Sequence, residues 1–471
     1  MTIKFGTDGW RDVIADNFTF ANVRQAAQAH AQYLKRAGGS SVVVGYDTRF
    51  LSDRFARAAA EVMAANGLTT HLTRTYVPTP ALSHAVVALE AAGGVMITAS
   101  HNPPAYNGYK IKGPYGGSAT PAIVREVEAE LERLQPTPSF DGARHAVIEH
   151  DPRPAYYGAL SRLLDSNALA EYPGVLYHDA MGGAGAGWID AYVKKAKLRA
   201  EVRPVHGVPN PTFYGVNPEP IPQNLESLRA VLAGEKRGVF GTATDGDADR
   251  VGAMLAGGTY FNSHQIFAVL LHHAVQRGKR GRVVKTFSTS QVIDLLAARH
   301  GLEVLETPIG FKYITDAFLE GEQDEARRVL IGGEESGGIS VQGHIPERDG
   351  IANTLLLLEA AAGTGRGPGE IFREIERDLG VTHAYDRIDL HVDQGFDRAA
   401  FLAGLAQPGT IAGRKVREVQ TKDGVKWLFE GFGWLLFRPS GTEPVVRIYS
   451  EAETNDEVRA ILRQAAALAG A

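Results

Sequence analysis

The sequence contains no cysteine. This absence excludes disulfide bonds, zinc–thiolate sites, iron–sulfur clusters and a thiol nucleophile. Strong net charge is also missing, because 49 Lys and Arg residues oppose 54 Asp and Glu residues, which gives a formal charge of −5. A charge this small provides no basic surface for nucleic acid or an anionic membrane, so we expect neither as a partner.

Long hydrophobic runs are absent as well. We find no stretch of about 18 apolar residues, and the first residues lack the charged and apolar regions of a signal peptide, so we expect a cytoplasmic protein. The length of 471 residues, at roughly 100–200 residues per domain, predicts about three domains, with two or four also reasonable. With 44% apolar residues the chain can bury several cores.

Two kinds of segment recur along the chain, three times each. The first kind is an apolar strand that runs into a small polar loop, at residues 42–49, 174–185 and 281–290. The second kind follows each of these after a helical pattern, at residues 95–104, 238–250 and 329–339. The repetition predicts three copies of one α/β unit with parallel strands. Ligands of such sheets bind beyond the carboxyl ends of the strands, so we expect the chemistry in these loops.

The pattern changes after about residue 380. Residues 388–392 alternate between apolar and polar side chains, further short strands follow, and a helical pattern near 456–468 ends the chain, as is typical of a smaller α+β domain. Polar stretches rich in Pro and Gly at 135–142 and 363–369 indicate boundaries. We therefore predict four domains, which are 1–150, 151–255, 256–378 and 379–471.

The segment Asp245-Gly-Asp-Ala-Asp-Arg250 follows an apolar strand and places three carboxylates at alternate positions. A tight loop can direct all three at one hard cation, and without a counter-ion they repel each other. An EF-hand is excluded, because the sixth loop position is Arg250 and the twelfth is Ala256. The loop therefore predicts a metal site, in which Arg250 either contacts a phosphate or offsets the loop's charge.

A hydroxyl and two basic groups follow the strand at 95–97. Ser100 stands beside His101 in Thr98-Ala-Ser-His-Asn-Pro103, and Lys110 lies a few residues on. The G-x-S-x-G pattern of a hydrolase nucleophile is absent, so a hydrolase triad is not indicated. A serine hydroxyl can carry a phosphoryl group if cations and a metal neutralise the transferring oxygens. Taken alone, a Ser–His pair is more often hydrogen-bonded structure than a catalyst.

Two further loops offer groups for a polar ligand. The segment 332–338 supplies carboxylates and a hydroxyl, which suit the hydroxyls of a sugar. The segment 438–444, together with Arg447, combines a bidentate cation, hydroxyls and backbone amides, which suit a phosphate.

These four loops, in this order, resemble those of the α-D-phosphohexomutase family, and the resemblance spans essentially the whole chain. It implies three similar α/β domains with mixed or parallel sheets and a C-terminal α+β domain around a central cleft. It also implies one Mg²⁺, a phosphorylated serine, hexose phosphates as small-molecule substrates, and a hexose 1,6-bisphosphate that serves as activator and intermediate.

The resemblance also implies a role for each matching residue. The catalytic residues are Ser100, which resembles the phosphoserine, His101 and Lys110, which resemble proton-transfer groups, and Arg11, a cation lining the cleft. The magnesium ligands are Asp245, Asp247, Asp249 and an oxygen of phosphorylated Ser100. The substrate-binding residues are Arg250, Lys285, Lys312, the sugar-binding Glu334 and Ser336, and the phosphate-binding Arg438, Ser440, Gly441 and Thr442.

The loop Glu334-Glu335-Ser336 resembles the phosphoglucomutase form of the sugar loop. Relatives that act on mannose or glucosamine phosphates usually carry Met or Gln at the middle position, and Gly337-Gly338 departs from the Gly-His of those groups. The resemblance therefore favours glucose 1-phosphate and glucose 6-phosphate, and leaves open a phosphomannomutase or a dual-specificity enzyme.

Three other interpretations compete. A dehalogenase-type phosphatase would use Asp245 as nucleophile and Asp247 as acid, but it predicts Thr or Val where this chain has Asp249. The stretch 182–187 is rich in Gly and suggests a dinucleotide fold, although its spacing is not G-x-G-x-x-G. A non-catalytic sugar-phosphate sensor needs the phosphate loop but has no use for Ser100 beside a three-Asp loop.

Overall fold

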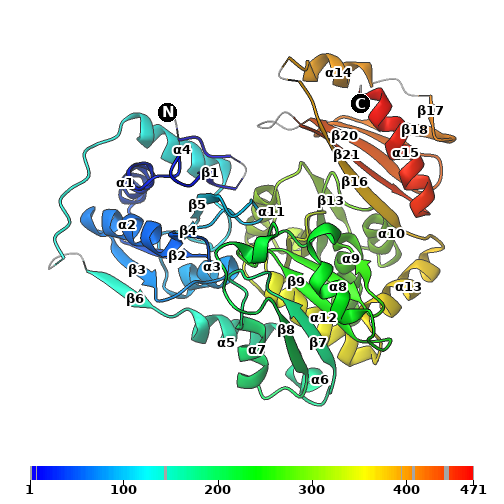
Figure 1. Cartoon of the computed structure of the whole chain (residues 1–471), viewed down its shortest axis with the longest axis horizontal. Coiled ribbons are helices and arrows are strands. Elements are labelled where there is room, and N and C mark those ends of the chain that lie inside the picture. Colours follow the sequence, from blue (N-terminus) through cyan, green and yellow to red (C-terminus); the bar gives the residue numbers. More distant parts are fainter. Residues whose placement is uncertain are drawn as a thin grey trace.

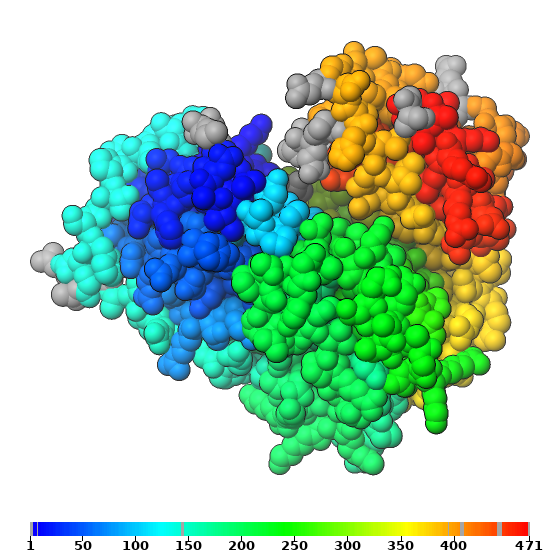
Figure 2. Space-filling view, in the orientation of Figure 1, coloured from blue at the N-terminus to red at the C-terminus, as the bar shows by residue number. Residues whose placement is uncertain are grey.

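A computed structural model of the chain describes residues 3–6, 8–142, 146–393, 395–405, 409–439 and 445–469. It contains four sheets, one in each of four domains that follow one another along the chain. The first domain lies at one side of the molecule and the fourth at the other, with the second and third between them (Figure 1). A notch separates the first domain from the fourth on the face that Figure 2 shows.

The first domain is built on a six-stranded mixed sheet. Its strands in spatial order are β1 (Trp10–Val13), β5 (Tyr106–Lys112), β4 (Gly94–Ile97), β2 (Ser41–Tyr46), β3 (Thr69–Thr73) and β6 (Val147–His150). Its helices are α1 (Phe20–Arg36), α2 (Ser52–Ala65), α3 (Thr79–Ala88) and α4 (Pro121–Glu132). Strands β3, β2 and β4 run parallel, and β6 joins them after the stretch at 135–142.

The second domain repeats this arrangement with five strands. Their order is β11 (Thr259–Phe261), β10 (Val251–Leu255), β9 (Phe240–Thr244), β7 (Val175–Asp179) and β8 (Glu201–Val205). The helices are α5 (Arg153–Leu163), α6 (Ser166–Ala170), α7 (Trp188–Lys195) and α8 (Glu226–Leu232), and two 3₁₀ turns, Phe213–Gly215 and Pro222–Asn224, lie in the loop before α8. Strand β11 continues this sheet past residue 255, because a turn at Gly257 and Gly258 folds the chain back onto β10.

The third domain has four strands, in the order β13 (Val304–Thr307), β12 (Arg282–Thr286), β14 (Val329–Gly333) and β15 (Ile339–Val341). The helices are α9 (Ser263–Gln276), α10 (Gln291–Arg299), α11 (Phe311–Gln323), α12 (Gly350–Thr364) and α13 (Pro368–Leu379), with a 3₁₀ turn at Glu325–Arg327. The stretch at 363–369 is not a domain boundary, because it forms the turn between α12 and α13, which both pack on α9.

The predicted threefold repeat is confirmed in the order of the strands. Each of the three domains places an antiparallel strand, two central parallel strands and a third parallel strand in the same sequence: β5-β4-β2-β3, β10-β9-β7-β8 and β15-β14-β12-β13. The two kinds of recurring segment are the central pairs β2 with β4, β7 with β9, and β12 with β14. The polar loops after β4, β9 and β14 therefore occupy equivalent positions.

The fourth domain is an antiparallel sheet covered on one face by helices. The strands in spatial order are β16 (Ala384–His391), β21 (Val445–Ala452), β20 (Trp434–Pro439), β19 (Val425–Phe429), β18 (Arg414–Gln420) and β17 (Thr410–Ile411). Its helices are α14 (Arg398–Gly404) and α15 (Asn455–Leu468). None of the described helices is both long and apolar enough to cross a membrane.

The first three domains share apolar packing, whereas the fourth has a core of its own. One cluster joins β2 and α3 of the first domain to helices of the second and third, and α12 lies within it with every residue from 350 to 361 buried. The core of the fourth domain is a separate cluster between its sheet and α15. A small cluster of Phe287, Trp434, Leu436 and Tyr449 joins the third and fourth domains.

A buried carboxylate, Glu451 on β21, completes that junction. Its oxygens accept hydrogen bonds from the Ser290 hydroxyl, the Gln291 amide at 2.8 Å and the Trp434 indole, and the His383 imidazole donates at 2.8 Å. Burial opposes ionisation, but the hydrogen bond and charge of His383 outweigh it and lower the pKa of Glu451 from about 4.5 to about 2. The ionised carboxylate therefore stabilises the junction.

We expect Glu451→Gln to destabilise this junction by about 1–3 kcal/mol at neutral pH, because buried donors lose their anionic acceptor. A lowered folded-state pKa stabilises the protein above pH 4.5, and this contribution is lost as pH falls from about 4.5 to about 2. Urea unfolding followed by tryptophan fluorescence should show the gap between wild type and variant narrowing over that range. Exposed Glu453→Gln is the control, and a gap that does not change with pH would contradict the assignment.

Candidate active site

The loops after β4, β9 and β14 converge although they come from three domains. Ser100 lies in the first loop, the aspartates in the second and Glu334 in the third. The loops touch directly, because the Ser100 hydroxyl donates to Asp245 at 2.7 Å and the backbone of Arg250 forms a β-bridge with Gly338. The equivalent positions of the three loops thus bring the predicted serine, metal and sugar segments together.

The three aspartates form a buried cluster. One carboxylate oxygen from each of Asp245, Asp247 and Asp249 lies within 4.8 Å of the other two, and all three side chains are fully buried. Asp245 Oδ1 accepts the backbone amides of Asp249 and Arg250 at 3.0 and 3.1 Å, which fixes the turn. Asp247 Oδ1 and Asp249 Oδ1 have no partner among the described residues. Such oxygens are costly to bury and suit a hard divalent cation, so the residues fit the expected Mg²⁺.

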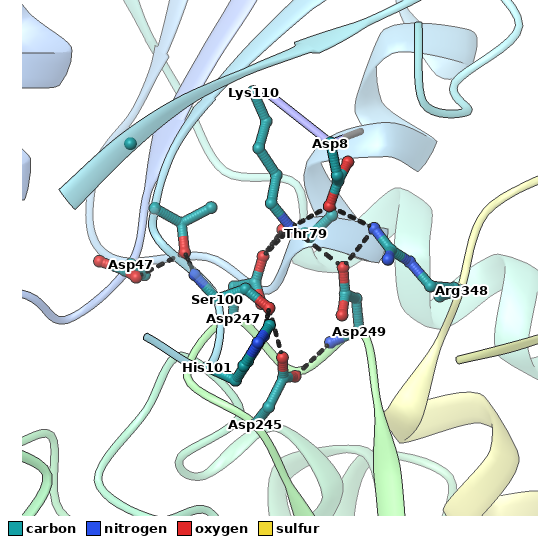
Figure 3. Close-up of polar contacts among 12 residues, drawn as sticks. Asp8, Asp47, Thr79, Ser100, His101, Lys110, Asp245, Asp247, Asp249 and Arg348 are labelled. Atoms are coloured by element: carbon teal, nitrogen blue, oxygen red, sulfur yellow. Dashed lines mark hydrogen bonds and ion pairs between the residues drawn. The ribbon is translucent and has the colours of Figure 1, made fainter. Parts of the chain in front are cut away.

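Ser100 is held against this cluster (Figure 3). Its hydroxyl also lies 3.4 Å from His101 Nδ1, and its backbone has φ +54°, a conformation that residues other than Gly adopt uncommonly. The metal loop approaches so closely that a Cβ added at Gly246 would lie 2.4 Å from the Ser100 carbonyl oxygen. Only glycine fits there, and the contact keeps the serine and metal loops adjacent.

Two buried cations face the carboxylates. Lys110 Nζ on β5 lies 2.8 Å from Asp247 Oδ2, 3.1 Å from Asp249 Oδ2 and 2.9 Å from Asp8 Oδ2. Arg348 Nη2, from the loop before α12, lies 2.8 Å from Asp249 Oδ2 and 2.7 Å from Asp8 Oδ2. Burial acts to lower the pKa of Lys110, but the three carboxylates raise it above its ordinary value, so the ammonium stays charged.

The charge remains unbalanced around Asp245. Burial and the neighbouring charges of Asp249 and Asp247 raise the pKa of Asp245 well above its ordinary value. No side chain of a described lysine or arginine lies within ion-pair distance of it, whereas Asp247 and Asp249 both contact Lys110. A bound cation would be the charge that stabilises its ionised form.

His101, Arg11 and Arg250 surround the serine. Burial, with the nearby charges of Arg250 and Arg11, lowers the pKa of His101 well below its ordinary value. Arg11 Nη1 donates to Asn102 Oδ1 at 2.8 Å, and Nη2 lies 3.5 Å from Asp8 Oδ2. Arg250 Nε is buried without a hydrogen-bond partner among the described residues. The guanidinium groups of Arg11 and Arg250 give the serine loop a cationic surround of the kind that receives an anionic substrate, and His101 beside them is held neutral.

The sugar loop is linked to this charge network. Glu334 is 6% exposed, its Oε2 lies 3.9 Å from Arg348 Nη1, and burial raises its pKa to about 7. Ser336 is half-buried. The Glu335 side chain instead turns into its own domain, where the Ser288 hydroxyl donates to Oε2 at 2.5 Å. The structure thus places Glu334 near the aspartate cluster and Glu335 away from it.

The two expected lysines of the third domain lie apart from the cluster. Lys285 is buried and paired with Asp294, with Glu306 Oε2 at 3.8 Å. Lys312 lies in the first turn of α11 (Phe311–Gln323), and its ammonium lies 5.2 Å from the centre of the Tyr313 ring. Neither lysine contacts the aspartates in this structure.

Arg438 leads the expected phosphate loop from β20. Its Nε donates to Asp423 Oδ1 at 3.2 Å, while Asp423 Oδ2 accepts the amide of Ile309 in the third domain at 2.9 Å. Arg447 lies opposite Arg438 on the neighbouring strand, β21. Ser440, Gly441 and Thr442 lie outside the described residues. The Asp423 bridge brings the start of the expected phosphate loop next to the loop that leads into α11, the helix that carries Lys312.

Sequence reasoning missed Asp8, Thr79 and Arg348. Asp8 stands in the same Gly-rich segment as Arg11, so its position was a usable signal. Thr79 donates to Asp247 Oδ2 at 2.7 Å from the start of α3, with no local sequence signal. Arg348 lies between two acidic residues in a buried turn, which reads in the sequence as an ordinary charged loop.

Comparison with known proteins agrees with this arrangement. Models of the phosphoglucomutase/phosphomannomutase α/β/α domains I, II and III match residues 2–137, 154–258 and 262–378, and the model of the C-terminal domain matches 398–468. A phosphoglucomutase/phosphomannomutase of Thermococcus kodakarensis is 31% identical over 464 residues, covering 97% of this chain and 96% of its own. A phosphoglucomutase of Komagataeibacter xylinus is 31% identical over 497 residues, covering 96% and 87%.

A solved structure from Thermus thermophilus, provisionally named a phosphomannomutase, superposes with a TM-score of 0.89 at 46% identity and covers all of both chains. The four matched domains, together with relatives aligned over nearly the whole length, identify the chain as a member of the phosphoglucomutase/phosphomannomutase family of phosphotransferase isomerases.

Proposed function

We propose that the protein interconverts glucose 1-phosphate and glucose 6-phosphate through a phosphorylated Ser100 and a glucose 1,6-bisphosphate intermediate. The contact of Ser100 Oγ with Asp245 at 2.7 Å carries the proposal, because it places a hydroxyl nucleophile against a buried three-carboxylate cluster. Neither a phosphosugar sensor nor a dinucleotide site needs that pairing. The Gly-rich segment 182–187 has a different role here. The backbone amide of Ala184 within it donates to the Gly246 carbonyl and supports the metal loop.

In the proposed reaction, phosphorylated Ser100 transfers its phosphoryl group to the free hydroxyl of a hexose monophosphate. The bisphosphate then reorients in the site and transfers its other phosphoryl group to Ser100. This second transfer releases the isomeric monophosphate. Ser100, Asp245, Asp247 and Asp249 would hold Mg²⁺, which when bound neutralises charge on the transferring oxygens. His101 and Lys110 are the proposed proton-transfer groups; His101 is within reach of Ser100 Oγ, whereas Lys110 is held by three carboxylates.

Reorientation of the intermediate requires a binding site for the phosphate that is not being transferred. This site must bind that phosphate equally well whether it is on C1 or on C6 of the sugar. We assign this role to Arg438, Ser440, Gly441 and Thr442, with Arg11, Arg250, Lys285 and Lys312 as further substrate contacts. Arg438 Nε donates to Asp423, and we propose that the outer guanidinium nitrogens bind the phosphate. Glu334 and Ser336 would hold ring hydroxyls in both orientations.

Glucose is the proposed sugar because Glu334-Glu335-Ser336 resembles the phosphoglucomutase loop. The phosphoglucomutase of Komagataeibacter xylinus supports this choice. Mannose is the second candidate, since the Thermus thermophilus neighbour has a phosphomannomutase name. A 32% identical relative from Frankia alni is named a phosphoglucosamine mutase, so amino sugars belong in the test.

We expect product analysis with glucose, mannose and glucosamine 1-phosphates, each with its 1,6-bisphosphate, to show the fastest conversion for glucose. Phosphorus NMR measures the 6-phosphates directly. Faster conversion of mannose 1-phosphate would show that mannose, and not glucose, is the preferred sugar. No conversion of any of the three would overturn the mutase assignment for these sugars.

Treatment with glucose 1,6-bisphosphate should add one phosphoryl group to the wild-type protein, as intact-mass analysis measures. Ser100→Ala should acquire none and lose activity, because the proposed acceptor hydroxyl is gone. Ser161→Ala is a matched control, since its hydroxyl donates to the Tyr157 carbonyl of the preceding turn of α5, away from the aspartates. Phosphorylation of Ser100→Ala on another residue would disprove the assignment.

Asp247→Asn should weaken Mn²⁺ binding at least about tenfold and reduce Mg²⁺-dependent turnover by orders of magnitude, because an anionic ligand is lost. The fold should persist, since the asparagine oxygen can still accept from Thr79 and Lys110 and repulsion within the cluster falls. Electron paramagnetic resonance of Mn²⁺ measures the affinity. Exposed Asp386→Asn is the control, and normal turnover of Asp247→Asn in a chelator would show that the metal interpretation is wrong.

A further inference from the structure

We propose that Arg49 is a positioning residue that fixes the Ser100 loop against the metal loop. The inference rests on the proposed function of Ser100 and concerns a residue outside the set that binds substrate or metal. Arg49 lies in the loop between β2 and α2, and its side chain is fully buried. A buried guanidinium is costly unless every N–H group is paired, so its partners reveal what it holds.

Every N–H of the Arg49 guanidinium has an acceptor. Nη2 donates to the carbonyls of Ser100 at 2.7 Å and Asn102 at 2.6 Å, and Nη1 donates to those of Pro103 at 2.8 Å and Tyr106 at 3.0 Å. Nε donates to Asp47 Oδ2 at 3.1 Å. Four carbonyls of the segment that follows β4 therefore depend on one side chain.

The segment needs this support because it has no regular structure of its own. Residues 98–105 belong to neither a helix nor a strand, so their carbonyls, including the buried one of Ser100, lack the regular partners of a ladder. Ser100 also has φ +54°, which the backbone does not favour without external contacts. The planar fork of an arginine can hold several carbonyls in one geometry, whereas a lysine ammonium cannot reach all four.

Asp47 anchors the arginine from the same strand end. Its carboxylate accepts the Thr98 hydroxyl at 2.6 Å, the Ser52 hydroxyl at 2.9 Å and the Arg49 amide at 2.9 Å. The Thr98 hydroxyl in turn accepts the Ser100 amide at 2.8 Å. Both the amide and the carbonyl of Ser100 are therefore fixed through this Asp–Arg pair.

Contacts from the second domain complete the arrangement. The Phe213 ring covers the guanidinium, with Arg49 Cζ 4.8 Å from its centre. The Ser100 carbonyl that Arg49 holds is the same oxygen that packs against Gly246 of the metal loop. Arg49 thus sets the position of Ser100 Oγ relative to Asp245, from behind the loop and without touching either group.

Arg49→Lys tests the inference, because it keeps the charge and removes the fork. We expect kcat to fall about 100-fold, the loss that a displacement of about 1 Å produces, while KM for glucose 1-phosphate stays within about threefold. The single-turnover rate of Ser100 phosphorylation by glucose 1,6-bisphosphate should fall by the same factor as kcat. Unchanged kcat, or a rise in KM alone, would overturn the role.

Arg277→Lys is the matched control. Arg277 also pairs a buried carboxylate, Glu359 at 2.8 Å, and donates to the Leu163 carbonyl at 3.1 Å, but it lies beyond the end of α9, outside the site. It should lose stability without losing kcat. An equal loss of kcat in both variants would show that Arg49 acts only through general stability.

If Arg49→Lys fails to fold, Asp47→Asn provides a second test of the positioning role of Arg49. It should lower kcat about tenfold with KM unchanged, because the guanidinium loses its anionic anchor but keeps its carbonyl partners. Unchanged kcat in a folded Asp47→Asn would overturn the inference. A wild-type protein that never becomes phosphorylated on Ser100 would instead refute the proposed function, whatever the variants show.

Discussion

The structure depends on balancing the negative charge of carboxylates that are buried close together. Asp245, Asp247 and Asp249 are fully buried within a few ångströms of one another, and Asp8 adds a fourth carboxylate nearby. Burying such charges costs several kcal/mol each unless opposite charges are close. The balancing groups come from different domains, with Lys110 from the first and Arg348 from the third. Charge neutralisation therefore requires that the three α/β domains be assembled in one arrangement.

The apolar packing separates the first three domains from the fourth. The first three domains share one apolar cluster, with the buried α12 inside it, and together they form the frame that holds the serine and the aspartates. The fourth domain keeps its own core and joins the third through a small aromatic cluster, Glu451 and Asp423. Lys426 adds a further link, because its ammonium donates to the Phe287 carbonyl at 2.8 Å, so the fourth domain is a separately packed unit joined to the third by polar and aromatic contacts.

The sequence predicted what local patterns encode and missed what assembly creates. Periodicity or spacing in the sequence alone was enough to recognise three features. These are the repeated strand-and-loop segments, the three-Asp loop and the tail starting near residue 380. Arg348 and Thr79 reach the aspartates only because the loop after β15 and the start of α3 lie beside them, so no spacing in the chain reveals them. Asp8 was within reach, since it shares a segment with Arg11. Ser440, Gly441 and Thr442 stay predictions from the sequence.

The equivalence of the loops after β4, β9 and β14 has a consequence for how such an enzyme can change. One structural position, repeated three times, carries the proposed nucleophile Ser100, the three-carboxylate cluster and the proposed sugar contact Glu334. In each domain the strand before that position directs the loop toward the same point, and the three loops carry different side chains there. On the proposed assignment, a substitution after β14 would therefore change the sugar contact and leave the residues of the other two loops unchanged.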